Sequence, residues 1–130
     1  RVCGDHFFAR HSIDYTGFRS YFHGFSIWDE HHCALGWDET ITWFELLGVI
    51  PVPVIWRGVF NEAVLKKLAR EIDTSSTEGF VVRLTSAFDY SKFSTSAAKW
   101  VRAQHVTSTT HWAHSVIVPN TLQKCNNVEN

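Results

Sequence analysis

The residues whose types and spacing best suit chemistry are one carboxylate and two cations around a predicted strand. Glu78 precedes the alternating apolar run 79–83, and Lys99 and Arg102 follow after a polar loop. Held on strands, these groups form a receptor for a metal-bound polyphosphate, and Gly79 lets another group approach the backbone closely. On residue types alone, the plainer interpretation is preferred: a buried strand ending in a solvated acid, followed by an ordinary basic turn.

Composition limits the function classes. The chain has 130 residues, 45% of them hydrophobic and 15% aromatic, which predicts one domain, or part of one, with its own core. The formal net charge of −1 excludes a global basic field of the kind that attracts nucleic acid. Any such binding must use a local cluster. The candidates are Arg57, Arg83, Lys92, Lys99 and Arg102.

The start of the sequence and its cysteines indicate whether it is complete and in which compartment it works. The sequence contains no methionine and opens as if a strand were already under way, so we expect a piece of a longer protein, incomplete at its N-terminus. Three widely spaced cysteines favour reduced thiols, and no apolar run approaches the length of a membrane span. We therefore expect a protein of the cytoplasm or nucleus that makes no membrane contact. Histidine-rich pairs such as His31 and His32 fit no common zinc spacing.

The order of predicted elements indicates an α+β fold built on antiparallel sheets with flanking helices. Asp38 is the expected N-cap of a mostly buried helix over 39–47 that stops at Gly48, and Asn61 is the expected N-cap of a helix over 62–71. The remaining predicted segments are strands over 2–9, 21–28 and 79–87, a proline-containing edge segment over 49–56, a polar loop over 91–96 and a polar tail over 119–130.

Four segments, taken in order, resemble the nucleotidyltransferase (ATP-grasp-like) domain of ATP-dependent RNA ligases and, more distantly, of DNA ligases and capping enzymes. They are Arg1-Val2-Cys3-Gly4-Asp5-His6-Phe7-Phe8-Ala9-Arg10-His11-Ser12-Ile13, Tyr21-Phe22-His23-Gly24-Phe25-Ser26-Ile27-Trp28-Asp29, Glu78 to Arg83, and Ala98 to Arg102. His105-Val106 and His111-Trp112 are similar to positions in bacterial and phage-type RNA ligases. The resemblance implies a partial nucleotidyltransferase domain over 1–118, and the order of the segments carries it more than any single one.

The resemblance implies nucleotide-binding roles for residues of the first two segments. Phe25 would stack on adenine, with Phe22 as the second choice, although a phenylalanine on a strand face usually packs in the core. Asp5 would contact the ribose. It stands where the family usually has glutamate, so its shorter side chain weakens that contact or leaves it to a bridging water.

The resemblance implies that the other two segments bind the divalent cation and the phosphates of ATP. Glu78 would position the divalent cation, Mg²⁺ or Mn²⁺, and Lys99 and Arg102 would neutralise the phosphates of ATP. These three residues are the expected catalytic group. With Asp5 and Phe25 they form the expected cofactor site.

The implied reaction has three steps: a lysine takes AMP from ATP, AMP passes to an RNA 5′-phosphate, and a 3′-hydroxyl then seals the strand. The lysine of that family belongs to a Lys-x-Asp-Gly motif, which these 130 residues do not contain. We therefore expect the chain alone to be inactive. Two alternatives stay open: a noncatalytic nucleotide- or RNA-binding module of the same fold, and an interaction domain in which the six tryptophans are core and contact residues.

Overall fold

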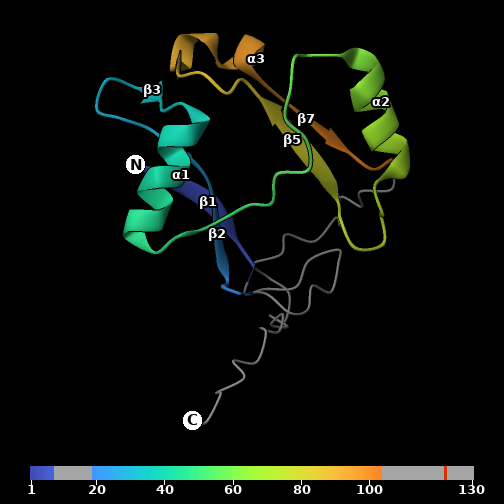
Figure 1. Cartoon of the computed structure of the whole chain (residues 1–130), viewed down its shortest axis with the longest axis horizontal. Helices are drawn as coiled ribbons and strands as arrows, with labels where there is room; N and C mark the ends of the chain where they lie inside the picture. Colours follow the sequence, from blue (N-terminus) through green and yellow to red (C-terminus); the bar gives the residue numbers. More distant parts are fainter. Residues whose placement is uncertain (8–18, 104–121, 123–130) are drawn as a thin grey trace, which may run out of the picture.

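The computed structural model describes residues 1–7, 19–103 and 122, in which short strands form three small sheets with helices beside them (Figure 1). This is the predicted α+β class. The elements in chain order are β1 (Val2–His6), β2 (Phe22–Ile27), β3 (Cys33–Ala34), α1 (Trp37–Leu47), β4 (Ile50–Pro51), α2 (Glu62–Glu71), β5 (Gly79–Arg83), β6 (Phe88–Asp89), the 3₁₀ turn η1 (Tyr90–Lys92), α3 (Phe93–Ser96) and β7 (Ala97–Val101).

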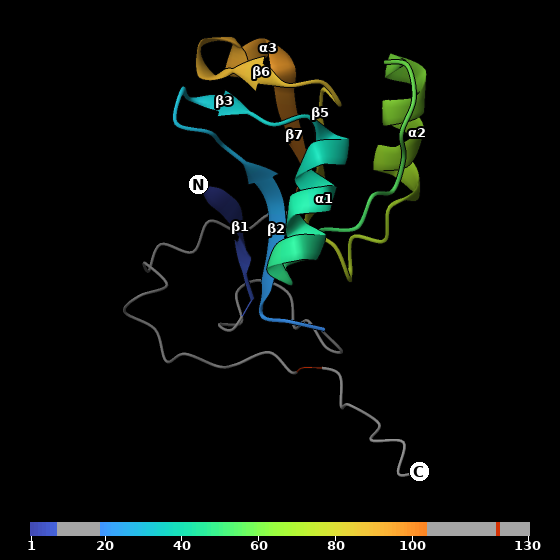
Figure 2. The same ribbon diagram turned by 60° about the vertical axis from the view of Figure 1, so that its left-hand side comes forward.

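The first sheet has the order β1-β2-β4. β1 and β2 are antiparallel, as predicted, with Asp5 opposite His23, whereas the short β4 joins β2 in parallel and makes this one sheet mixed. Pro51 lies on β4 at the sheet edge, where a residue without a backbone donor is tolerated, as predicted. Helix α1 packs against β2 (Figure 2), and a Cβ on Gly24 would lie 2.6 Å from the Phe44 ring. Phe44 is buried at this close approach, and the other buried apolar residues among those described, Ala34 and Phe88, are paired on β3 and β6.

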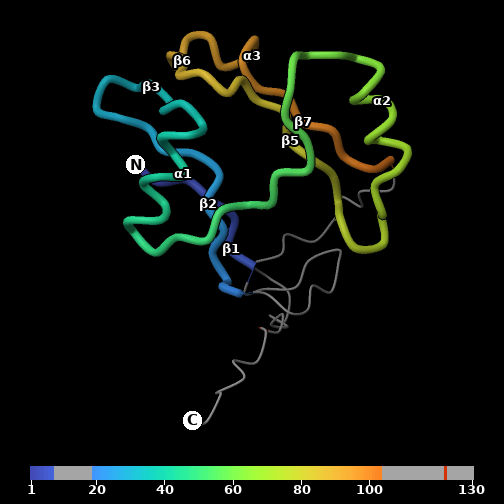
Figure 3. Tube along the Cα trace, viewed as in Figure 1, coloured from blue at the N-terminus to red at the C-terminus, as the bar shows by residue number. Residues whose placement is uncertain are grey.

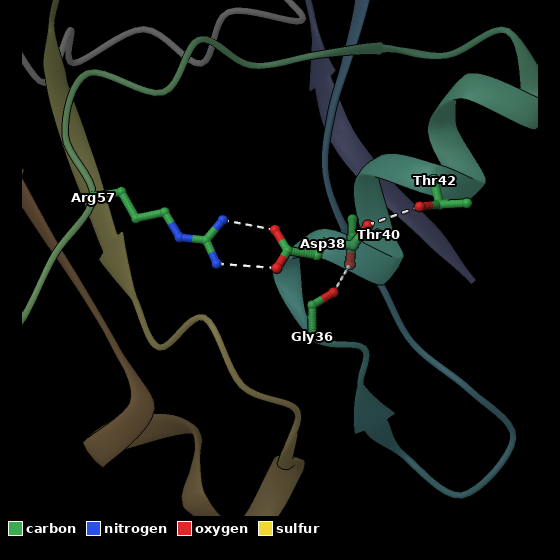
Figure 4. Close-up of polar contacts among 5 residues, drawn as sticks. All are labelled: Gly36, Asp38, Thr40, Thr42 and Arg57. Carbon is green, nitrogen blue, oxygen red and sulfur yellow. Dashed lines mark hydrogen bonds and ion pairs between the residues drawn. The ribbon is translucent and has the colours of Figure 1, made fainter.

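Helix α1 begins earlier than predicted. Its N-cap is Gly36, so Asp38 is not the cap but a residue of the first turn. The Asp38 carboxylate instead receives two hydrogen bonds from Arg57, at 2.6 and 3.1 Å (Figure 4). The carboxylate still lies near the positive end of the helix dipole. The C-terminal stop is the predicted one, because Gly48 adopts φ 68°, a left-handed conformation that favours glycine.

The expectation that α1 is mostly buried is wrong. Only Thr40 and Phe44 of this helix are buried, whereas Trp43 and Leu46 are 46% and 72% exposed. A helix that contacts one small sheet can bury only one stripe of side chains. The apolar residues around the rest of its circumference stay at the surface.

Helix α2 forms as predicted. The Asn61 side chain accepts a hydrogen bond from the Ala63 backbone N–H at 2.9 Å, which satisfies one of the free donors of the first turn. Glu62 and Lys66 form an i,i+4 ion pair at 2.7 Å. The connection from α1 to α2 crosses the molecule (Figure 3), and the Arg57–Asp38 pair ties it to α1 on the way.

Strands β5 and β7 form an antiparallel pair beside α2, with Gly79 opposite Val101 and Val81 opposite Lys99. Phe80 and Trp100 stack across the pair, with ring centroids 5.4 Å apart. β5 ends at Arg83, four residues before the predicted end at residue 87.

The polar segment 91–96 is not the predicted loop but forms the end of η1 and all of α3. Its Phe93 joins an aromatic cluster with Trp28, Phe88 and Tyr90, in which the centroid distances from Trp28 are 5.8 to 6.4 Å. Contacts among these rings offset the weak helix propensity of a serine- and threonine-rich segment.

Three further predictions concern thiols, membranes and the tail. Cys3 and Cys33 are free thiols, and Cys125 lies outside the described residues. Within the described part of the chain, the helices are too short and too polar to cross a bilayer. The predicted tail over 119–130 falls outside the described residues, except for Leu122.

Candidate functional site

Two of the expected site residues, Asp5 on β1 and Glu78 just before β5, are brought together from distant parts of the sequence. Desolvation by the surrounding protein raises the pKa of Asp5 above 3.8, and the negative charge of Glu78 raises it further. Asp5 is exposed as a whole residue, so this desolvation is local to its carboxyl group. Two carboxylates that repel each other at one place form a site for a positively charged ligand.

His23 belongs to the same cluster and was not among the predicted site residues. It lies opposite Asp5 in the β1–β2 register, and its ring contacts Phe7 edge-on at a centroid distance of 5.4 Å. Desolvation lowers the pKa of His23, while a hydrogen bond to the Ser20 backbone and the charge of Asp5 oppose that shift. His23 could have been identified from the sequence only by aligning the two predicted strands in the correct register, which places His23 opposite Asp5.

Glu78 is held by the backbone of β7. Its carbonyl accepts a hydrogen bond from the Arg102 N–H at 3.0 Å, and the side chain is half-buried. The close approach predicted at Gly79 is confirmed, and the approaching group is β7 itself: a Cβ on Gly79 would lie 2.0 Å from the Trp100 carbonyl oxygen. The glycine therefore fixes where Glu78 lies relative to β7.

Lys99 lies on β7, the strand next to β5, and Arg102 directly follows the end of that strand; their side chains lie on different faces. Alternation along β7 places Lys99 with Val81 on an exposed face, whereas Arg102 shares the opposite face with Trp100. Lys99 lies about 10 Å along the strand from the position opposite Glu78, at about 3.4 Å per residue. Neither cation has a carboxylate partner among the described residues.

Arg102 is one of the residues that line an open concavity of about 360 Å³ between α2 and β7. One of its guanidinium nitrogens, Nη1, donates to the carbonyl of Thr74, whereas the buried Nε atom has no hydrogen-bond partner within the described part of the chain. The concavity is lined by Ala69, Thr74, Trp100, Arg102 and Ala103. No sequence pattern predicts this arrangement, because Ala69 and Thr74 come close to Trp100 only in the folded chain.

The two candidate stacking residues differ in their surroundings. Phe25 is 39% exposed and lies where the β1–β2 register shifts, with Ser26 opposite Cys3 but Gly24 opposite Gly4. Phe22 packs over Gly4, where an added Cβ would lie 2.5 Å from its ring. Phe25 therefore has open ring surface for a ligand, and Phe22 has a packing role.

Arg83, considered only as part of a basic cluster, has a structural role. Its Nη2 donates to the Leu35 carbonyl at 2.8 Å, and its guanidinium lies 5.1 Å from the centre of the Phe88 ring. These contacts join β5 to the segment before α1. The remaining residues of the resemblance, 8–13 and the histidine-containing segment 105–112, lie outside the described residues.

The donor set at Asp5 and Glu78 fits a magnesium or manganese ion. Mg²⁺ prefers oxygen ligands, takes one or two carboxylates and keeps several waters, and Asp5 and Glu78, which lie within electrostatic range of each other, are carboxylates of that type. Among the described residues, no three histidine, cysteine or acidic side chains converge as a metal-binding group. Asp5 and Glu78 are the described residues that would hold such an ion, and it would supply positive charge against phosphate oxygens.

Comparison with known proteins gives one match: residues 1–101 match the RNA ligase family. No curated protein and no solved structure matches the chain. Because the match covers more than half of the 130 residues, the chain belongs to the RNA ligase family.

Proposed function

We propose that this member of the RNA ligase family supplies the nucleotide- and metal-binding part of an ATP-dependent enzyme that joins RNA 5′-phosphate and 3′-hydroxyl ends. In the whole protein, the reaction passes through enzyme–AMP and RNA-adenylate intermediates. The observation that carries the proposal is the match of residues 1–101 to the RNA ligase family, and the electrostatic proximity of Asp5 and Glu78 is consistent with it. Asp5 and Glu78 are 73 positions apart in the sequence; Asp5 lies on β1, and Glu78 directly precedes β5, which belongs to another sheet.

Each site residue has a role that its surroundings support. Phe25 offers exposed ring surface to the adenine, and Asp5 lies where it can contact the ribose or a metal-bound water. A bound divalent ion would supply Lewis-acid stabilisation of phosphate charge. Lys99 and Arg102 carry positive charge that no carboxylate neutralises among the described residues, so both are free to bind phosphate oxygens.

Calorimetric titration of the chain with ATP and Mg²⁺ tests this proposal. We expect Glu78→Gln to weaken Mg·ATP binding by about tenfold or more, because one charge-assisted contact is removed. Glu45→Gln makes the same chemical change at an exposed position of α1 and should leave binding unchanged. Equal effects of the two variants, or metal-independent binding that both variants retain, would reject the proposed site.

A test for covalently attached AMP can exclude the alternative binding module. No Lys-x-Asp-Gly occurs in the 130 residues, so we expect no AMP to remain covalently attached after incubation with labelled ATP and Mg²⁺. The same missing motif, with Asp5 in place of the usual glutamate, favours a noncatalytic nucleotide- or RNA-binding module as the second candidate. Formation of a lysine–AMP adduct on this chain would exclude that candidate and contradict our expectation.

A further inference from the structure

One side of helix α1 carries apolar side chains that stay exposed in the described part of the chain. Trp43, Leu46 and Leu47 are 46%, 72% and 55% exposed, and their spacing of i, i+3 and i+4 makes them neighbours on the helix. Glu39, one turn before Trp43, is exposed on the same side. We call these four residues the α1 surface. Single exposed apolar residues are ordinary, but an adjacent group that includes a tryptophan indicates an interaction surface.

The α1 surface is separate from the candidate nucleotide site. Gly24 of β2 faces the Phe44 ring of α1, so strand alternation places His23 and Phe25 on the other face of the sheet. Asp5 lies opposite His23 and shares that other face. Helix α1 therefore covers one face of the sheet (Figure 2), and the expected nucleotide-binding residues of β1 and β2 lie on the other.

The sequence around the α1 surface is acidic. Residues 20–56 contain five acidic residues and no lysine or arginine. Three of the five lie on α1, and only Asp38 has an ion-pair partner among the described residues, Arg57. The last turn of α1 holds no basic residue, so the negative end of the helix dipole is uncompensated beside the exposed leucines. A ligand that complements this surface brings positive charge as well as apolar area.

We propose that the α1 surface is the docking site of a basic amphipathic helix from a partner protein. The apolar face of that helix packs on Trp43, Leu46 and Leu47, and its lysines or arginines reach Glu39 and the C-terminal end of α1. An RNA strand is disfavoured, because its phosphates would meet the same acidic residues. A second copy that docks through its own α1 is disfavoured too, because α1 has three acidic residues and no cation.

The test titrates the 130-residue chain into a fluorescently labelled model peptide, an amphipathic helix with leucines on one face and lysines on the other, and follows anisotropy. We expect Leu46→Ala to weaken binding about fivefold, because apolar contact is lost. Glu39→Gln should weaken binding about threefold at low salt and not at about 0.5 M salt, where exposed charges are screened. Trp43→Ala should weaken it about tenfold or more, because tryptophans dominate such interfaces.

The matched controls make the same chemical changes at exposed residues outside α1. Leu84→Ala and Glu71→Gln should leave binding within about twofold of wild type. A peptide with glutamates in place of its lysines keeps the apolar face but reverses the charge, so it should not bind. Circular dichroism verifies the folding of each variant. If Trp43→Ala does not fold, Leu46→Ala decides the question, because its side chain is largely exposed.

Three results would overturn the inference. They are no binding of the lysine peptide by the wild type, equal losses in Leu46→Ala and Leu84→Ala, and equal binding of the lysine and glutamate peptides. Sedimentation of the chain alone gives a further check. A concentration-dependent dimer that Leu46→Ala abolishes would assign the α1 surface to a second copy and reject the partner helix.

Discussion

Replacing Gly79 by alanine tests how the site is held together. Gly79 is not among the described glycines with positive φ, so its need for glycine is steric rather than conformational. An added Cβ would lie 2.0 Å from the Trp100 carbonyl oxygen and 2.9 Å from the Val101 Cα. Ordinary contacts begin near 3.4 Å, so β5 and β7 would have to separate by more than about 1 Å at this pair.

The magnitude follows from that displacement. Overpacking typically costs about 1–3 kcal/mol, and a lost cross-strand hydrogen bond, such as Arg102 N–H to the Glu78 carbonyl, costs about 1 kcal/mol. We expect Gly79→Ala to lower the free energy of unfolding by about 2–4 kcal/mol. Urea denaturation followed by tryptophan fluorescence measures this change.

Gly48→Ala is the matched control. Gly48 has φ 68°, and nothing lies within 4 Å of an added Cβ, so alanine there causes backbone strain of about 1 kcal/mol without any clash. Gly79→Ala should therefore destabilise the chain at least twice as much as Gly48→Ala. If Gly79→Ala stays within about 0.5 kcal/mol of wild type, β7 does not hold Glu78 in the way described.

Three further predictions use the same denaturation assay. Asn61→Ala should lower the free energy of unfolding by about 1 kcal/mol through the lost cap of α2, whereas Asn61→Asp should restore most of it. The hydrogen bonds and charge of Arg57 lower the pKa of Asp38 in the folded chain, so this pair stabilises the fold above the unfolded pKa of Asp38. Wild type loses that stability only as the pH falls through the lowered pKa. Asp38→Asn should lack it already at pH 7. An Asp38→Asn variant with the same free energy of unfolding as wild type at pH 7 would contradict this prediction. The pKa of Asp5 is raised in the folded chain, so ionisation of Asp5 destabilises the fold as the pH rises through that folded-state pKa. Asp5→Asn should therefore stabilise the chain at pH 7. The same variant should weaken Mg·ATP binding. Loss of stability in Asp5→Asn at pH 7 would refute the repulsion from Glu78.

Local signals predicted the local features of the fold. Asn61 before an amphipathic run marked the start of α2, and Gly48 marked the end of α1, because caps act within one turn. The signal of Asp38 was misleading, since an acidic residue is equally favourable at the cap and in the first turn. The hydrogen bonds from Arg57, 19 residues away, depend on the path of the connecting segment, so no pattern of neighbouring residues predicts them.

In the candidate site, too, the sequence predicts which residue types are involved but not where the fold places them. Sequence order and residue type singled out Asp5, Glu78, Lys99 and Arg102, and the fold brings the first two together. Residue type cannot say which face of a strand a side chain occupies relative to another element, because that depends on register. Lys99 and Arg102 are three residues apart, so strand alternation places them on opposite faces once β7 is known to be extended there. Two cations that look equivalent in the sequence therefore lie in different surroundings: Lys99 is on the exposed face with Val81, and Arg102 is on the face of Trp100.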